Sequence, residues 1–156
     1  MEQPKSLEQV AEFHKTFQHP VLDTPQIPSE NRCALRVELI SEELKELAEA
    51  IAEKDLVEIA DALCDIQYVL SGAILEFGLG NKFKELFDEV QRSNMSKACI
   101  SEEEAQATVD AYAKKGVRGY YKEIEGKWLV FREGDNKTLK SVNYSPADLK
   151  SILDKE

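Results

Sequence analysis

Apolar residues recur every three or four positions through most of the first hundred residues, a period that predicts amphipathic helices. The expected helices cover residues 6–18, about 30–52, 56–77 and 82–93. Ser6 and Ser29 stand at the beginnings of the first two and are the expected N-caps. Because only the polar residues 53–55 separate the second helix from the third, these two helices are expected to form a tight antiparallel hairpin.

The pattern changes after residue 100. A helix capped by Ser101 is expected over residues 101–116, and β-branched and aromatic residues then gather in segments separated by Gly-containing turns. These segments, residues 118–124, 125–133 and 138–145, predict two hairpins of a small antiparallel sheet, and a short helix opens at Pro146. We therefore expect a mainly α protein. Residues 1–100 form a helical domain, and residues 101–156 form a C-terminal helix and β appendage packed on it.

Acidic residues interrupt the apolar faces of the predicted hairpin. Glu43 lies in the middle of the apolar arc of the second helix, with Glu46 at the edge of that arc. The third helix is apolar around most of its circumference, and Glu58, Asp61 and Asp65 stack along one narrow strip. A helix that is apolar nearly all round is normally buried, so these acids are expected to line an interior groove.

The hairpin would bring the acids of its two helices together, with Glu46 opposite Asp61, and with Glu42 and Glu43 near Asp65. Uncompensated carboxylates at such distances repel one another and lose hydration, unless they are protonated or a cation joins them. Oxygen-only ligands suit Mg²⁺ first and Mn²⁺ next. With 30 acidic residues in the chain, any single pair of acids can also be part of a solvated helix face.

The order Glu42-Glu43-x-x-Glu46 followed by Glu58-x-x-Asp61 resembles the signature of the all-α nucleoside triphosphate pyrophosphohydrolase superfamily. That superfamily includes MazG-like proteins, dimeric dUTPases and phosphoribosyl-ATP pyrophosphohydrolases. The similarity continues from FHKTF through LRVELISEE and ADALCDIQYVLSGA to EVQRSNMSK, about residues 7–97. It implies a MazG-like helical bundle and a Mg²⁺-dependent enzyme that cuts a nucleoside triphosphate between its α and β phosphates, releasing the monophosphate and pyrophosphate.

The resemblance also implies roles for the acids. Two or three Mg²⁺ ions would bridge the substrate phosphates and lower the pKa of a bound water. Their expected ligands are Glu43, Glu46, Glu58 and Asp61, of which Glu43 is also assigned as catalytic. Glu42 is expected to orient or deprotonate the water, with Asp65 as the second choice.

Further candidates would hold the rest of the nucleotide. Asn94 and Lys97 match the family ending that grips phosphate oxygens, and Arg92 lies beside them, where a cation could instead serve the dipole of its helix. Phe13 and His14 belong to the N-terminal region that supplies the family's base pocket, although their apolar stripe is also a docking face.

Three more positions complete the candidate set. Asp65 and Tyr68 continue the acidic strip and are candidates for a base or ribose pocket. Arg36 lies on the arc of Glu43 two turns earlier. It is either a snorkelling or acid-paired arginine or a contact for a substrate phosphate.

The composition of the chain limits the kinds of partner that we expect it to bind. A net charge of −10 argues against nucleic acid and against an anionic membrane. The three cysteines are widely separated and favour neither a disulfide framework nor a zinc site, and Cys64 fits a small core residue. Without a signal-like segment or a run of eighteen apolar residues, a cytoplasmic location is expected. Since a two-helix hairpin leaves one face uncovered, we expect a homodimer or homotetramer, as the resemblance implies.

The sequence does not identify the substrate. Removal of unwanted nucleotides such as dUTP, dCTP or non-standard triphosphates is the first expectation, by analogy, and phosphoribosyl-ATP is the alternative. A di-iron carboxylate bundle is excluded because the sequence has no Glu-x-x-His pair. The other class to be tested is a non-enzymatic helical interaction module whose acids are surface residues.

Overall fold

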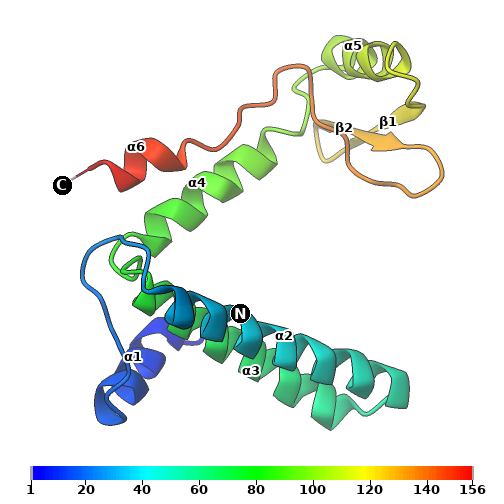
Figure 1. The fold of residues 1–156 in the computed structure, drawn as a ribbon. Helices are drawn as coiled ribbons and strands as arrows, with labels where there is room; N and C mark the ends of the chain where they lie inside the picture. The colour runs from blue at the N-terminus through cyan, green and yellow to red at the C-terminus, as the bar shows by residue number, and fades with distance from the viewer. Residues whose placement is uncertain (1, 156) are drawn as a thin grey trace. The chain divides into compact units, whose positions relative to one another are not determined.

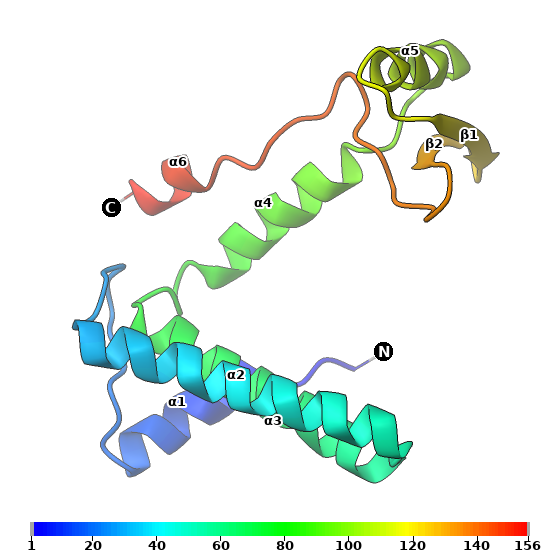
Figure 2. The ribbon, with the colours of Figure 1, turned by 45° about the vertical axis from the view of Figure 1, so that its right-hand side comes forward.

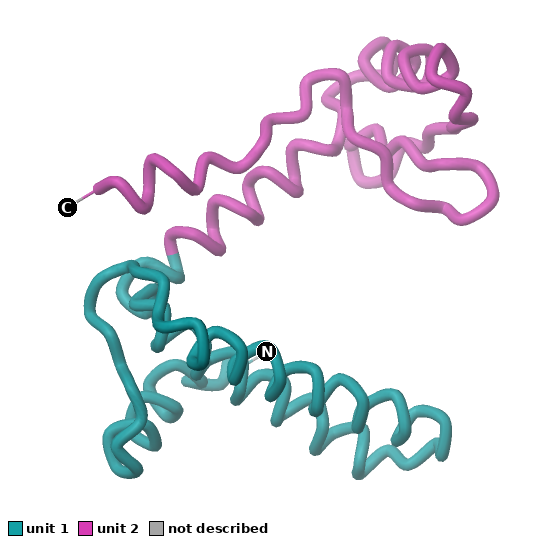
Figure 3. Tube along the Cα trace, in the orientation of Figure 1, with its two compact units in different colours: residues 1–84 teal, residues 85–156 magenta. Residues whose placement is uncertain are grey.

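The computed structural model describes residues 2–155, and its contacts divide the chain into two compact units, Met1–Lys84 and Glu85–Glu156 (Figure 3). The boundary between them falls within the first turn of helix α4 (Phe83–Met95). The expected division into a domain of residues 1–100 and an extension of residues 101–156 stays a prediction. The mainly helical fold with a small C-terminal antiparallel sheet is confirmed.

The first unit is a helical hairpin flanked by a shorter helix. Helices α2 (Glu30–Glu53) and α3 (Leu56–Glu76) run antiparallel, and α1 (Ser6–Thr16) packs against α3 (Figures 1 and 2). The hairpin turns where sequence analysis places it. Lys54 adopts a left-handed conformation at the end of α2, and the Asp55 side chain caps α3 by accepting hydrogen bonds from the backbone of Val57 and Glu58.

The serine caps expected for the first two helices are not made. Ser6 is the first residue of α1, after Lys5 at the N-cap, so that prediction is wrong. Ser29 does occupy the N-cap of α2, but its side chain makes no capping hydrogen bond. Its carbonyl oxygen instead accepts hydrogen bonds from Arg32 and Cys33, as the first turn of the helix requires.

The connection between α1 and α2 is fixed to the end of α3. The amides of Leu22 and Gln26 donate to the carbonyl oxygens of Leu75 and Phe77, at 3.0 and 3.1 Å. Gly78 allows this approach, because its φ is +68° and a Cβ at this position would lie 1.9 Å from the Thr24 carbonyl oxygen. The connection therefore closes over the C-terminal end of α3, which is the best-buried part of that helix.

Helix α3 is not buried along its whole length, contrary to expectation. Its C-terminal part, residues 71–76, is mostly buried, whereas Leu56 is 77% exposed and Leu63 is 52% exposed. Cys64 is also exposed, so its assignment to the core is wrong. The reason is that α1 and α2 cover only part of the circumference of α3 within this unit.

The second unit packs α5 (Glu102–Ala113) on an antiparallel pair, β1 (Gly119–Ile124) and β2 (Lys127–Arg132). The strands pair from Gly119 with Arg132 to Ile124 with Lys127. Ser101 caps α5, as expected, by accepting a hydrogen bond from the amide of Glu104. The core of this unit consists of Cys99, Ala105, Val130 and Leu139.

The second expected hairpin is absent from the described residues. Residues 138–145 form no strand and make only an isolated bridge between Phe131 and Thr138. Here the backbone bonds elsewhere: the amide of Val142 donates to the Thr108 hydroxyl, and that of Tyr144 to the Ser141 carbonyl. A short helix, α6 (Leu149–Leu153), follows with Asp148 as its cap. None of the described helices is both long and apolar enough to cross a membrane.

Candidate active site

A cavity of about 470 Å³ lies among the three helices of the first unit. It brings together Glu43 and all four residues proposed for a base or ribose pocket. Its lining residues are Phe13, His14, His19, Arg32, Leu35, Arg36, Leu39, Glu43, Asp65, Tyr68 and Val69. The cavity thus has an aromatic wall, two arginines and two carboxylates.

The aromatic wall is centred on Phe13. Its ring stacks on His19 with ring centroids 5.9 Å apart and an interplanar angle of 16°, and it meets Tyr68 edge-on at 5.6 Å. Phe13 and Tyr68 are 38% and 39% exposed, so parts of both rings remain accessible. A flat aromatic ligand can stack on such a wall.

His14 is the buried member of this wall, with 3% of its surface exposed. Its Nδ1 lies 2.8 Å from the carbonyl oxygen of Pro20, and since a carbonyl only accepts, Nδ1 carries the proton. Burial lowers the pKa of His14, in spite of the hydrogen bond to Pro20, which raises it. The ring is therefore neutral near pH 7, and its Nε2 is a hydrogen-bond acceptor.

Two arginines of α2 converge on one buried carboxylate of α3. Glu76 has no exposed surface and accepts hydrogen bonds from Nε and Nη2 of Arg32 and from Nε of Arg36. Burial alone would raise the pKa of Glu76, but the hydrogen bonds and charges of the two arginines together lower it. Arg36 is thus acid-paired, and the contact with a substrate phosphate that the sequence also leaves open stays a prediction.

Sequence reasoning missed Arg32, His19 and Glu76. The signal for Glu76 was present, because it is a carboxylate at the end of the apolar stretch of α3, where an unpaired charge is rarely tolerated. Arg32 and Arg36 are four residues apart on one helix face and could have suggested a common partner. His19 lies in the connection after α1, where helical periodicity gives no guide to position.

The acids of the two hairpin helices act on one another. Burial is the main cause of a raised pKa at Glu43, followed by the charges of Asp65, Glu46, Glu42 and Asp61. Glu43 and Asp65 are half-buried. The other predicted acids, Glu42, Glu46, Glu58 and Asp61, are exposed, so they do not line an interior groove in this chain.

The donor chemistry of this group fits a hard divalent cation, because every donor is a carboxylate oxygen. Within residues 2–155 no three His, Cys, Asp or Glu side chains are arranged as a metal-ligand set. Burial and the charges of the neighbouring carboxylates raise the pKa of Glu43, and a cation bound among these acids would relieve the repulsion. Glu43, Glu46, Glu58 and Asp61 are the residues that would hold Mg²⁺.

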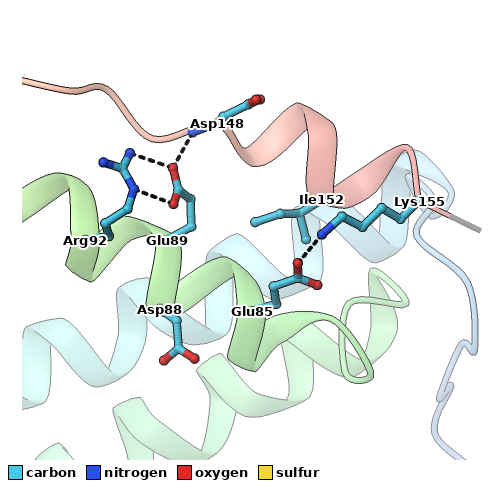
Figure 4. Close-up of a pocket in the computed structure, with 7 residues that line it drawn as sticks. All are labelled: Glu85, Asp88, Glu89, Arg92, Asp148, Ile152 and Lys155. Atoms are coloured by element: carbon cyan, nitrogen blue, oxygen red, sulfur yellow. Dashed lines mark hydrogen bonds and ion pairs between the residues drawn. The ribbon is translucent and has the colours of Figure 1, made fainter.

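The three residues proposed to bind phosphate belong to the second unit. Arg92 makes a two-point contact with Glu89, at 2.7 and 2.8 Å, and also donates to the Ser145 hydroxyl and the Pro146 carbonyl, both at 3.0 Å. Figure 4 shows Glu89 between Arg92 and the backbone of Asp148. Arg92 and then Asp148 lower the pKa of Glu89 to about 2. In this structure Arg92 thus ties the C-terminal segment to α4.

Asn94 and Lys97 lie at the end of α4 and form a pair. The Lys97 ammonium donates to the Asn94 side-chain oxygen at 2.8 Å, and neither residue takes part in the contacts of the C-terminal segment with Arg92. Their part in phosphate binding stays a prediction, as does that of Arg92.

A helical hairpin with carboxylates on both helices, beside an aromatic-lined cavity, agrees with the resemblance to the all-α nucleoside triphosphate pyrophosphohydrolase superfamily. Residues 10–94, more than half of the chain, match the model of the phosphoribosyl-ATP pyrophosphohydrolase family, and the chain belongs to that family. The resemblance seen in the sequence is confirmed.

The chain is also similar to an uncharacterized protein of Acanthamoeba polyphaga mimivirus, with 36% identity over 100 residues. The aligned part covers 62% of this chain but only 40% of the viral protein. The chain therefore spans well under half the length of this curated relative.

Proposed function

We propose that the protein is a Mg²⁺-dependent nucleoside triphosphate pyrophosphohydrolase that removes unwanted nucleotides, with dUTP, dCTP or a non-standard triphosphate as substrate. The products are the nucleoside monophosphate and pyrophosphate. One observation carries the proposal: Glu43 has its pKa raised by burial and by four neighbouring carboxylates, and it lines a cavity that aromatic side chains also line. Perturbed acids beside a ligand-sized cavity are typical of active sites.

The acids divide into two tasks. Glu43, Glu46, Glu58 and Asp61 would hold Mg²⁺, which would relieve charge on the phosphates and make a water more acidic. Glu42 or Asp65 would take the proton from the attacking water. Asp65 lines the cavity and Glu42 does not, which gives Asp65 the shorter path to a substrate bound there.

The base binds in the cavity of the first unit. The nucleobase stacks on one of the rings of Phe13 and Tyr68, which meet edge-on, and the neutral His14 offers Nε2 as an acceptor for a base N–H group. Arg92, Asn94 and Lys97 grip the phosphate oxygens. For Arg92 this requires that a substrate phosphate compete with Glu89 and the C-terminal segment for the guanidinium.

A second copy of the chain completes the site. Helix α3 exposes large apolar side chains, namely Leu56, Val57, Leu63 and Leu70. Burying such a stripe is the usual driving force for helix association. We therefore propose a homodimer or homotetramer, and light scattering of the wild type and of Leu63→Glu measures it. A wild type that is monomeric at micromolar concentration excludes this part of the proposal.

The family match favours a second candidate, hydrolysis of phosphoribosyl-ATP. This substrate has the same triphosphate and the same α-β bond to be cut, so the acids keep their tasks. The two candidates differ because, for phosphoribosyl-ATP, the cavity must hold the phosphoribosyl group as well as the base and ribose. Relative kcat/KM for phosphoribosyl-ATP and for simple triphosphates separates them.

The test is a nucleotide panel scored for monophosphate and pyrophosphate, with Mg²⁺, with Mn²⁺ and with a chelator. We expect pyrophosphate release that depends on the metal and is lost in Glu43→Gln. Glu49→Gln is the matched control, because Glu49 is exposed on the same helix and pairs with Lys45. An interaction module would show no turnover with any nucleotide and no change in melting temperature with Mg²⁺, and that result would exclude the proposed enzyme.

A further inference from the structure

We propose that Arg36, held by Glu76 together with Arg32, is a subsite for a phosphate group of the substrate. This inference rests on the proposed function and adds a recognition element to it. Arg36 and Glu43 lie on the same helix and line the same cavity, seven residues apart. Two turns of helix separate their backbones by about 10 Å, so the phosphate at Arg36 is not the one being attacked beside Glu43.

Arg36 is buried with hydrogen-bonding capacity to spare. It is 7% exposed, and its hydrogen bond to Glu76 uses only Nε. Among residues 2–155 its two terminal amino groups have no hydrogen-bond partner, although the side chain lines the cavity. A guanidinium with its fork unfilled is the group that fits a phosphate best.

The charges at this end of the cavity do not cancel. Arg32 and Arg36 carry two positive charges and Glu76 one negative charge, which leaves a net charge of +1. His14 is neutral. The charges that act on Glu43, which lines the same cavity, are all those of carboxylates. The arginine end is therefore positive while the end near Glu43 and Asp65 is negative.

The position of Arg36 is fixed before any ligand arrives. Glu76 holds Nε, and the backbone of α3 approaches the guanidinium at Gly72, where a Cβ would lie 2.8 Å from Nη1 of Arg36 and 2.9 Å from Nε2 of His14. Glycine thus provides the space in which the arginine and histidine side chains lie. A preorganised cation loses little entropy on binding an anion, which favours recognition over a purely structural pair.

The phosphate can come from two sources. One is the terminal phosphate of the triphosphate, and the other is a second phosphate carried elsewhere on the substrate. Both sources present a phosphate group to Arg36, so the structure of the cavity does not distinguish them. Substrates that differ in one phosphate distinguish them.

The test compares Arg36→Lys with the wild type by steady-state kinetics and by competitive inhibition. Lysine keeps the charge but loses the fork. Arg132→Lys is the matched control, because Arg132 also donates from Nε to a carboxylate, that of Asp135, but outside the cavity. We expect Arg36→Lys to raise KM about tenfold with kcat within about twofold, and Arg132→Lys to change neither.

The source of the phosphate is read from pairs of ligands. If it is the terminal phosphate, Arg36→Lys weakens binding of a nucleoside triphosphate but not of the matching diphosphate. If it is a second phosphate, the variant weakens binding of phosphoribosyl-ATP but not of ATP. Equal weakening of both members in each pair, or a fall in kcat with KM unchanged, overturns the proposal.

A measurement on the wild type keeps the proposal testable if Arg36→Lys does not fold, and also if no turnover is found. The arginine side-chain ¹⁵N resonances are followed during titration with inorganic pyrophosphate. We expect saturable shifts at Arg36 and none at Arg132. Absence of a shift at Arg36 overturns the subsite, whereas absence of pyrophosphate release from every nucleotide by the wild type overturns the proposed function alone.

Discussion

Glu43 and Glu76 show how differently one side chain behaves at two places in the same helical unit. Glu76 has no exposed surface, yet two arginines keep its pKa below the ordinary value. Glu43 is only half-buried, but burial and four carboxylates raise its pKa. Burial acts in the same direction on both residues, so the sign of the net shift is decided by the charge of the neighbours.

Glu76 is a carboxylate that stabilises the fold, whereas Glu43 is a carboxylate that the fold tolerates. The Arg32 and Arg36 contacts of Glu76 join α2 to the end of α3, so they contribute to folding. The neighbours of Glu43 only repel it. We propose that binding a divalent cation offsets this repulsion, because every donor in the cluster is a carboxylate oxygen.

The largest expected effect is on turnover, at Glu43. Glu43→Gln keeps the size of the side chain and removes its charge, so pyrophosphate release should fall about 10³-fold while the circular dichroism spectrum is unchanged. Glu49→Gln should keep wild-type activity, because Glu49 is exposed and contacts Lys45 rather than the acid cluster. A Glu43→Gln protein as active as the wild type would contradict the role given to this residue.

The next effect is on stability, at Glu76. Glu76→Gln leaves two buried or half-buried arginines without their carboxylate, and we expect a loss of about 3 kcal/mol in the free energy of unfolding, measured by urea denaturation. Because the pKa of Glu76 is lowered in the folded state, its contribution is full above the unfolded pKa and is lost as pH falls through the folded value.

The difference between the wild type and Glu76→Gln should therefore be constant near pH 7 and shrink in acid. Asp135→Asn is a useful comparison, since Asp135 also has its pKa lowered by an arginine but lies exposed in the second unit. It should have little effect on stability at neutral pH. A Glu76→Gln protein as stable as the wild type would show that the buried pair is dispensable for the fold.

A smaller effect is expected at Gly72. In Gly72→Ala the new Cβ would approach Arg36 and His14 closer than 3 Å, so one of these side chains must move. Overpacking costs about 1–3 kcal/mol and the higher helix propensity of alanine returns about 1 kcal/mol, which leaves a modest net loss in thermal stability. If Arg36 is the side chain that moves, KM should rise without a change in kcat.

Local sequence patterns predicted the helices of the first unit, whereas the sequence did not predict the contacts between residues that are far apart along the chain. The hairpin follows from helical periodicity and the polar break at Lys54, and the acid spacing alone indicated that Glu43 would meet Asp65. The contact between Arg36 and Glu76 joins residues 40 positions apart, and each helix indicates that its charged residue needs a partner without indicating which partner. The exposed face of α3 was missed because apolarity indicates what must be covered, not whether the same chain covers it.

The second unit shows the same limit. The capped helix α5 and the Glu125-Gly126 turn were predictable, because caps and turns depend on neighbouring residues. Residues 138–145 have the composition of a strand, but the Thr108 hydroxyl takes the amide of Val142. A strand prediction from composition cannot anticipate a side chain that competes for the backbone.

The smallest expected effect tests the repulsion at Glu43 directly, through the pH dependence of stability. The pKa of Glu43 is raised in the folded state, so the protonated form is favoured by folding, and this stabilisation is present below the unfolded pKa and lost as pH rises through the folded value. Without metal, Glu43→Gln should thus be more stable than the wild type at pH 7.5, by about 0.5 kcal/mol, and equal to it near pH 4. Differential scanning calorimetry at both pH values measures this difference in stability.

Addition of Mg²⁺ at pH 7.5 should reverse the order of stability, because the ion stabilises the ionised wild type and has lost a ligand in the variant. A wild type that stays less stable than Glu43→Gln in saturating Mg²⁺ would mean that no cation joins these carboxylates.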